Sequence, residues 1–397
     1  MVRCDTWSRR DPVGTLGAGA AMSLRVIRVT LREIRLALRE PFEISSGLTT
    51  DRRILLLELE DADGVTVWSE CVAGERPNFS AETIDTAWLA ISEWFAPRVL
   101  AGSVPHPSAL EPKLAANIRG RVMARAAIEM GGWALWAVRR ERSLSRTIGG
   151  TRRSIGTGIS LGIQTTPSVL VDKTRAALSA GYRKLKIKIR PGADIEFIGA
   201  VCEALGPDAP LMADANSAYT LQHADHLADL DPFRLMMIEQ PLTHDDLRRH
   251  AQLQDRLATP ICLDESITGL DRAEDMLALS SGRIINIKSG RVGGFTQAKA
   301  IHDLCQRSGV PVWCGGMLES GIGRAYNVAL ASLPNFTLPG DVSPSARYWE
   351  RDIVVPEWTM DAGSMVSVPV DELGLGVAVD IGRVDDLTQR SLTLTSS

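Results

Sequence analysis

Three acidic residues stand at equal intervals in the chain, each at the end of a short apolar run. Asp214 ends the run LMAD, Glu239 ends LMMIE and Asp264 ends ICLD, so both intervals are 25 residues (239 − 214 and 264 − 239). Since one strand–helix–strand unit of a parallel barrel takes ~25–30 residues, this spacing predicts three carboxylates at the C-terminal ends of consecutive strands. Helix capping would explain any one of these acids, but it does not require equal spacing. Three oxygen ligands at a barrel mouth suit Mg²⁺ better than a soft metal.

Two lysine-bearing strands flank these acids in the predicted strand order. Residues 183–189 alternate lysines with aliphatic residues, and helix-like segments on both sides indicate a central strand that is buried on both faces. The lysines of this strand, Lys186 and Lys188 among them, must then point into the barrel, where a lysine is costly unless it is paired or functional. Residues 283–288 form a second such run, which ends on Lys288. The sequence therefore predicts a metal ion between Lys188 and Lys288.

The rest of a (β/α)8-type (modified TIM) barrel can be placed around this site, over residues 141–350. The remaining strands are predicted at residues 155–161, 311–314 and 336–338. Amphipathic segments fit between the strands, at residues 167–180, 195–205, 221–230, 245–257, 271–280, 296–307 and 323–333. Thr166 is the expected N-cap of the first of these helices, with Pro167 at its first position and Gly181 beyond its end.

A second, α+β domain is predicted from residues 22–140 together with a returning C-terminal segment, 351–397. Antiparallel strands are expected at residues 24–36, 53–59 and 65–70, with a turn at 61–64. Helices are expected at residues 81–100, with Trp88 and Trp94 on the apolar side, and at 115–138. Residues 353–370 indicate strand and turn, followed by a polar tail. Residues 1–21 are predicted to be a disordered extension.

Composition favours a cytoplasmic enzyme of two domains. The 397 residues carry a net charge of −4 with both signs interspersed, which gives no support to nucleic-acid or membrane binding. No apolar run approaches the ~20 residues that span a bilayer, and the first 21 residues lack the apolar core of a signal peptide. The six cysteines are scattered without metal-site spacing. The six histidines fall on predicted helices or loops and receive no role: His106, His223, His226, His244, His250 and His302.

Five motifs in order resemble the enolase superfamily, muconate-lactonizing subgroup. They are Lys186-Ile187-Lys188, Asp214-Ala215-Asn216, Ile238-Glu239-Gln240-Pro241, Leu263-Asp264-Glu265-Ser266 and Asn286-Ile287-Lys288. Within the subgroup, residues 288–294, 314–324 and 339–341 are similar to the branch of N-acylamino acid (N-succinylamino acid) racemases and o-succinylbenzoate synthases. Dipeptide epimerases carry Asp-x-Asp where this chain has Asp341-Val342-Ser343, and mandelate-racemase-like members carry a histidine where it has Cys314-Gly315. The family's Trp-Asp pair is Trp136-Ala137 here, which predicts weaker docking of that helix.

The resemblance implies removal of the proton α to a carboxylate, through an enediolate that Mg²⁺ stabilises, with Mn²⁺ as a substitute. We expect Lys188 to be the base on one face of the substrate and Lys288 on the other. Lys186 should depress the pKa of Lys188 through like charge. In a racemase the two lysines exchange roles as acid and base. In the dehydration that forms o-succinylbenzoate, a step of menaquinone biosynthesis, Lys188 alone could act and Lys288 would contribute its charge.

Eight further residues are predicted to bind the substrate or to support the site. Asn216 could bond the metal carboxylates or their waters, or only form a turn. Glu265 could reach Lys288 or a water near the metal, and Arg291 could bias Lys288 by charge or be an ordinary solvated loop residue. The others are the pocket candidates Met317, Leu318, Glu319, Ile322 and Ser160. The loop 41–50 should close over a small carboxylate substrate.

Two alternatives remain, a Schiff-base aldolase with Lys288 as its lysine and a non-catalytic binding barrel. A homo-oligomer is expected.

Overall fold

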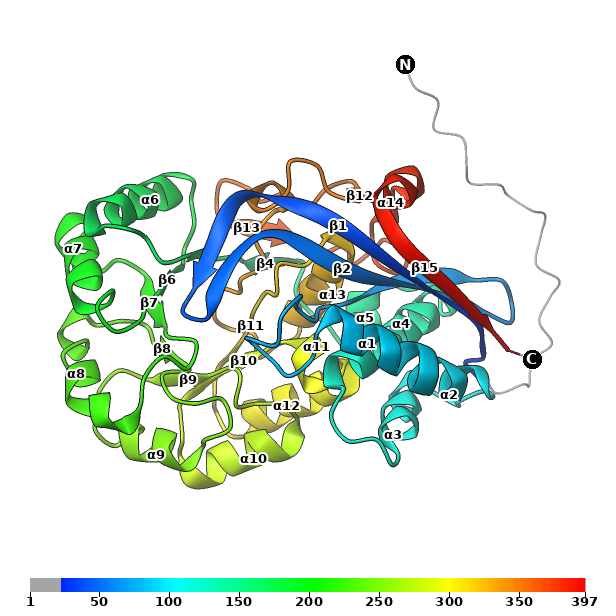
Figure 1. The fold of residues 1–397 in the computed structure, drawn as a ribbon, viewed down its shortest axis with the longest axis horizontal. Helices are drawn as coiled ribbons and strands as arrows, with labels where there is room; N and C mark the ends of the chain where they lie inside the picture. The colour runs from blue at the N-terminus through cyan, green and yellow to red at the C-terminus, as the bar shows by residue number, and fades with distance from the viewer. Residues whose placement is uncertain (1–22, 397) are drawn as a thin grey trace, which may run out of the picture.

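A computed structural model describes residues 23–396, and its centre is a parallel sheet of seven strands curved into a barrel (Figure 1). Neighbouring strands follow the order β11-β10-β9-β8-β7-β6-β5, so each strand pairs with its neighbour in the chain. Their bounds are β5 (Ile159–Leu161), β6 (Leu185–Lys188), β7 (Leu211–Asp214), β8 (Ile238–Glu239), β9 (Ile261–Leu263), β10 (Ile284–Ile287) and β11 (Val312–Cys314).

Helices follow the strands and cover the outside of the barrel (Figure 1). They are α6 (Pro167–Ser179), α7 (Ile195–Leu205), α8 (Ala224–Ala228), α9 (Arg248–Gln254), α10 (Leu270–Leu279), α11 (Ser289–Val292), α12 (Phe295–Arg307) and α13 (Gly321–Ala331). Thr166 caps α6 as predicted, because its hydroxyl accepts the backbone N–H of Val169 and Pro167 occupies the first turn. The predicted barrel is confirmed.

The barrel departs from the prediction at its two ends. Residues 336–338 form no strand, since turn bonds such as Thr337 N–H to the Asn335 carbonyl occupy their backbone, and only isolated parallel bridges close the barrel here. The predicted strand 155–161 is interrupted, because Thr157 and Gly158 donate their backbone N–H groups to the Ser364 and Gly340 carbonyls. Its first part is β4 (Ser154–Gly156), which pairs with β13 (Met365–Ser367).

The other part of the molecule is an antiparallel sheet of order β15-β1-β2-β3, packed with helices. Its elements are β1 (Val26–Ile44), β2 (Gly47–Asp61), β3 (Thr66–Cys71), α1 (Ile84–Ala90), α2 (Ala96–Leu100), α3 (Leu110–Ala115), α4 (Val122–Arg139), α5 (Leu144–Ile148) and β15 (Thr388–Thr395). We call this part the cap. A π-helical turn joins α1 to α2, and the predicted turn at 61–64 is confirmed by the bond from Gly64 N–H to the Asp61 carbonyl.

Three predictions for the cap were wrong. The C-terminal polar tail is the helix α14 (Ile381–Leu387) followed by β15, whose alternating threonines and leucines suit an edge strand that pairs with β1. Trp94 is 40% exposed and does not belong to the apolar side of its helix. The second long helix begins at Val122 instead of residue 115. Between the barrel and β15 lie the short strands β12 (Val354–Val355) and β14 (Ala378–Val379).

Within residues 23–396, no helix is long and apolar enough to cross a membrane. The prediction for residues 1–21 lies outside the described residues.

The cap docks on the barrel through a buried carboxylate. Glu129, on α4, is fully buried and accepts the backbone N–H groups of Phe295 (2.8 Å) and Thr296 (3.0 Å), the first residues of α12. It therefore takes the place of an N-cap side chain, which Gly294 lacks: a Cβ there would lie 2.1 Å from the Glu129 carboxylate. Almost all of α4 between Met123 and Ala137 is buried, so the helix packs closely without the family's aspartate.

Glu129→Ala is expected to lower the free energy of unfolding by about 2–4 kcal/mol, because two helix N–H groups would lose their buried acceptor. Urea unfolding followed by circular dichroism measures the change. The matched control is Glu274→Ala on the exposed face of α10, which should change stability by less than about 0.5 kcal/mol. Equal effects of the two substitutions would contradict the capping role of Glu129.

Candidate active site

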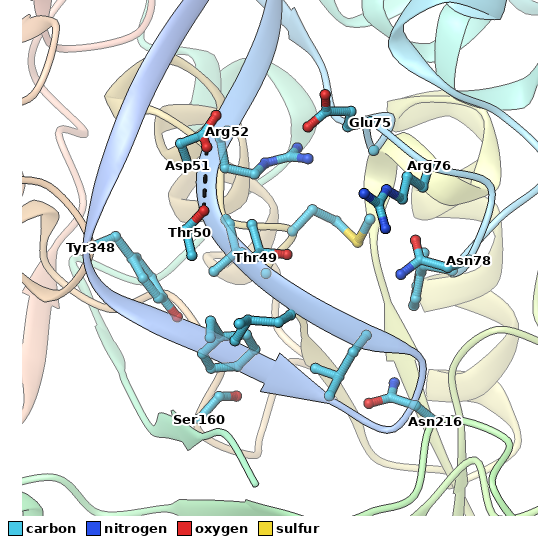
Figure 2. A pocket seen from close by; sticks show the side chains of 18 of the residues that line it. Thr49, Thr50, Asp51, Arg52, Glu75, Arg76, Asn78, Ser160, Asn216 and Tyr348 are labelled. Atoms are coloured by element: carbon cyan, nitrogen blue, oxygen red, sulfur yellow. Dashed lines mark hydrogen bonds between the residues drawn. The ribbon is translucent and has the colours of Figure 1, made fainter.

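A cavity of about 420 Å³ lies between the C-terminal ends of the barrel strands and the β1–β2 hairpin of the cap (Figure 2). Lys186 and Lys188 reach it from β6, and Lys288 reaches it from the end of β10. Because successive side chains of a strand point to opposite faces, the alternating lysines of β6 all point inward, as predicted, and each is less than 10% exposed. The cavity therefore contains the predicted lysines from two sides of the barrel.

Lys188 is held by two oxygen atoms. Its Nζ lies 2.6 Å from Asp214 Oδ2 and donates to Asn216 Oδ1, also at 2.6 Å. Burial lowers the pKa of Lys188, the charge of Lys186 lowers it further, and Asp214 opposes both. The predicted effect of Lys186 is present, but burial is the larger cause.

Lys186 is the centre of an ion-pair cluster. Its Nζ lies 2.6 Å from Asp341 Oδ2 and 3.2 Å from both Asp214 Oδ2 and Glu239 Oε2. Burial lowers the pKa of Lys186, but these three carboxylates outweigh burial and raise it well above its usual value. Lys186 thus carries a fixed positive charge beside Lys188. Below it, Lys184 lies 3.1 Å from Asp341 Oδ1 and 3.5 Å from the centre of the Trp313 ring.

Lys288 and Arg291 share one carboxylate. Lys288 Nζ lies 2.8 Å from Asp264 Oδ2, and Arg291 pairs with Asp264 Oδ1. Arg291 also donates to the backbone carbonyls of Asn286 (2.6 Å) and Ile267 (2.9 Å), and it is only 4% exposed. The reading of Arg291 as a solvated loop residue was therefore wrong. Its link to Lys288 is the shared Asp264 carboxylate, and an effect on Lys288 stays a prediction.

The three predicted metal ligands stand at the ends of β7, β8 and β9, which are neighbouring strands. Asp214 and Glu239 are paired residues of neighbouring strands, and burial followed by the charge of Asp214 raises the pKa of Glu239. Lys188 and Lys186 hold the pKa of Asp214 well below its usual range, against burial. Asp264 is also fully buried, so all three carboxylates need nearby positive charge.

The donor atoms fit a hard cation. They are buried carboxylate oxygens, and two more buried oxygens nearby, Glu265 Oε2 and Asn286 Oδ1, have no hydrogen-bond partner among the described residues. Across residues 23–396, however, no three His, Cys, Asp or Glu side chains stand at metal-binding spacing, and lysine ammonium groups lie against the carboxylates instead. The metal-ligand role of the three acids stays a prediction.

Asn216 links Lys188 to Glu265. Its side-chain amide donates to Glu265 Oε1 (3.0 Å), and its backbone N–H bonds Asp214 Oδ1 (3.1 Å). Its backbone φ of 43° also makes it a turn residue, so it combines both predicted roles. Glu265 bonds Asn216, and no bond to Lys288 is present in the described chain. Burial, followed by the charge of Asp214, raises the pKa of Glu265 to about 7.

The predicted pocket residues divide into three groups. Ser160, Met317 and Leu318 line the cavity, and the Ser160 hydroxyl donates to Asp341 Oδ2 (3.0 Å). Glu319 is buried behind the wall, where it accepts the backbone N–H of Met317 at 2.7 Å and so holds that loop. The placement of Ile322 was wrong. It is fully buried on α13, all of whose residues pack inside the protein, and it does not reach the cavity.

Sequence reasoning missed much of the cap side of the site. Residues 41–50 are not a loop but the tip of the long hairpin, with Ile44 paired to Gly47 across the turn. The register of β1 and β2 shifts between Ala37 and Phe42, so Pro41 lies where the two strands are not paired. Its lack of a backbone N–H therefore breaks no bond of the sheet. The tip reaches over the barrel, where the Ser45 hydroxyl donates to the Asn216 carbonyl (3.1 Å). Asp341 was quoted only for its motif, although it anchors Lys184 and Lys186.

Known family models match both parts of the chain. "Mandelate racemase / muconate lactonizing enzyme, N-terminal domain" matches residues 26–149, and "Enolase C-terminal domain-like" matches residues 169–383. The chain belongs to the enolase superfamily. Enzymes of this superfamily generally use Mg²⁺.

Individual relatives cover nearly the whole enolase-superfamily chain. An o-succinylbenzoate synthase from Geobacillus stearothermophilus is 48% identical over 93% of this chain and 97% of its own length. An N-succinylamino acid racemase from Thermus thermophilus is 44% identical over 92% and 98%. The crystal structure of an enolase-superfamily member from Listeria innocua, 36% identical, superposes with a TM-score of 0.90 and covers 94% of this chain and 100% of its own. The chain is therefore an enzyme with a capped barrel, and the aldolase and non-catalytic alternatives are superseded.

Proposed function

We propose that this enzyme removes the proton α to the carboxylate of an N-succinylamino acid and returns a proton to the opposite face, so that it racemises the substrate. The observation that carries the proposal is the placement of Lys188 and Lys288. They enter one cavity from β6 and from the end of β10, on the two sides of the carboxylate cluster. A racemase needs one acid–base group on each face of the reacting carbon.

The residues around the lysines support this role. Burial and the charge of Lys186 lower the pKa of Lys188, which favours its action as a base. Asn216 accepts from Lys188 and fixes the direction of its ammonium group. The ion pairs with Asp341 keep Lys186 charged beside the substrate carboxylate. The β1–β2 hairpin lines the cavity on the side of the cap.

Asp214, Glu239 and Asp264 would hold the Mg²⁺ that superfamily members use. When bound, it would supply positive charge against the substrate carboxylate as the α-proton leaves. Mn²⁺, with the same preference for oxygen ligands, should substitute for it.

A second candidate is dehydration of a cyclohexadiene precursor to o-succinylbenzoate as the main activity. The 48% identical relative bears the name of that enzyme and favours this candidate. The same residues would serve, with Lys188 as both base and acid and Lys288 as a fixed positive charge. We rank racemisation first because Arg291 and Lys288 share the Asp264 carboxylate. The charge of Arg291 offsets part of the charge of Asp264, so Lys288 can release its proton more readily, as a racemase requires.

Steady-state assays with Mg²⁺ on two substrates test the proposal. N-succinyl-phenylglycine is followed by polarimetry, and the cyclohexadiene precursor is followed by ultraviolet absorbance. Racemisation with kcat/KM above about 10⁴ M⁻¹s⁻¹, a value ordinary for enzymes, is the expected result. Activity on the precursor alone would select the second candidate.

Arg291→Met should reduce racemisation about tenfold more than dehydration. Without Arg291, the Asp264 carboxylate interacts with the Lys288 ammonium alone and should hold its proton more tightly. A change of about 1.4 kcal/mol in the reaction barrier corresponds to a tenfold change in rate. Racemisation needs Lys288 to lose and regain its proton, whereas dehydration needs only its charge. Comparing kcat/KM for both reactions in the same preparation measures the difference. Equal losses would leave Arg291 as structural support for Asp264 only.

A further inference from the structure

Arg52, on β2 of the cap, is a buried cation without an ion pair. It lines the cavity and is only 7% exposed. Its one hydrogen bond goes to the Ala73 carbonyl at 3.3 Å, and its buried Nε has no partner. Among residues 23–396, no carboxylate lies within the 4.0 Å of an ion pair with Arg52. Since a buried charge is costly unless it is paired, this arginine requires an explanation.

The acids nearest to Arg52 do not balance its charge. The Glu70 carboxyl is engaged by α13 instead, because it accepts the Ser320 hydroxyl (2.6 Å) and the backbone N–H of Gly323 (3.1 Å), and burial raises its pKa to about 8. Glu319 is already paired with Arg324, at 3.4 Å. Glu75 is exposed and lies 3.7 Å from Arg35, which also pairs with Asp51. No carboxylate among residues 23–396 is therefore paired with Arg52, and an anionic group of a bound ligand would fill that place.

The position of Arg52 suits the far end of a bound substrate. Figure 2 shows its guanidinium group on the opposite side of the cavity from Ser160 and Asn216, which lie beside the reacting lysines. Arg76, from the loop after β3, points toward the same region and likewise forms no ion pair within the described chain. A guanidinium group offers paired donors that match the two oxygens of a carboxylate.

We propose that Arg52 binds the distal carboxylate of a dicarboxylate substrate, which in the function proposed above, on which this assignment rests, is the terminal carboxylate of the succinyl group. Both candidate substrates carry that group, so the subsite serves either reaction. Arg52 acts on binding and not on the reacting carbon. Its loss should therefore raise KM and leave kcat little changed.

A matched pair of substrates isolates this contact. N-succinyl-phenylglycine and N-butyryl-phenylglycine have acyl chains of equal length, and a methyl group replaces the carboxylate in the second. The wild-type enzyme should prefer the succinyl compound by about 100-fold in kcat/KM, the value of a desolvated, charge-assisted hydrogen-bonded pair. In Arg52→Met the preference should fall below about threefold, through a higher KM for the succinyl compound. A wild-type circular dichroism spectrum shows that the variant is folded.

Two further variants complete the test. Arg52→Lys keeps the charge but not the paired donors, so it should retain a preference of about tenfold. Arg28→Met removes an arginine of the same sheet that pairs with Glu60 and does not line the cavity, and it should keep the full preference. Persistence of the succinyl preference in Arg52→Met, or its absence from the wild-type enzyme, would overturn the subsite but leave the racemase proposal standing. Failure of the wild-type enzyme to turn over either compound would overturn both the subsite and the racemase proposal.

Discussion

Glu239→Gln, Asp214→Asn and Asp264→Asn are each expected to lower kcat/KM by about 1,000-fold or more. Each replacement keeps the size of a buried side chain and removes one negative oxygen from the predicted metal site. A bound metal ion is expected to stabilise the transition state by several kcal/mol. Because about 1.4 kcal/mol corresponds to a tenfold change in rate, losing the metal accounts for an effect of this size. EDTA should likewise abolish activity, and Mg²⁺ or Mn²⁺ should restore it.

Two controls separate metal binding from folding. Glu274→Gln on exposed α10 should leave kcat/KM unchanged. Titration with Mn²⁺, followed by its electron paramagnetic resonance signal, should show one site in the wild-type protein and weakened binding in the three variants. The variants should keep the wild-type circular dichroism spectrum. Full turnover by metal-free protein would refute the metal site, whatever the effect of the substitutions.

Lys188→Ala and Lys288→Ala are each expected to abolish racemisation, with losses of about 100- to 10,000-fold. Each variant keeps a lysine on one face only. In D₂O, Lys288→Ala should therefore still exchange the α-proton of one enantiomer through Lys188, and Lys188→Ala should exchange only the other enantiomer. Proton NMR of the separate enantiomers measures both rates. Lys299→Ala, on the outer helix α12, is the matched control and should behave as the wild-type enzyme.

Equal loss of exchange from both enantiomers in both lysine variants, with folding intact, would contradict a lysine on each face. Retention of racemisation by either variant would remove that lysine from the proposed mechanism.

Local periodicity explains why the barrel side of the site could be predicted. Alternation along a strand puts the lysines of β6 on one face, and the helix-like segments on both sides of the strand indicated that this face lies inside a barrel. The equal spacing of Asp214, Glu239 and Asp264 reflects one strand and one helix per unit. These signals need only short stretches of sequence.

Residues that depend on distant pairing could not be placed in this way. Arg52 lies next to Arg53 at the beginning of a predicted strand, and nothing local shows that one guanidinium enters the cavity while the other binds Glu33 and Asp85. Asp341 meets Lys186 only because the barrel closes on itself. The C-terminal strand β15 has few apolar residues, and its structure depends on pairing with β1 at the other end of the chain.

The central claim is that one site places a lysine on each face of a carbon next to a carboxylate. Exchange of the α-proton by the wild-type enzyme with Mg²⁺ in D₂O tests it most directly, with each pure enantiomer of N-succinyl-phenylglycine followed by proton NMR. We predict exchange from both enantiomers, with deuterium in the enantiomer formed. Exchange from one enantiomer only, or from neither, would contradict the claim.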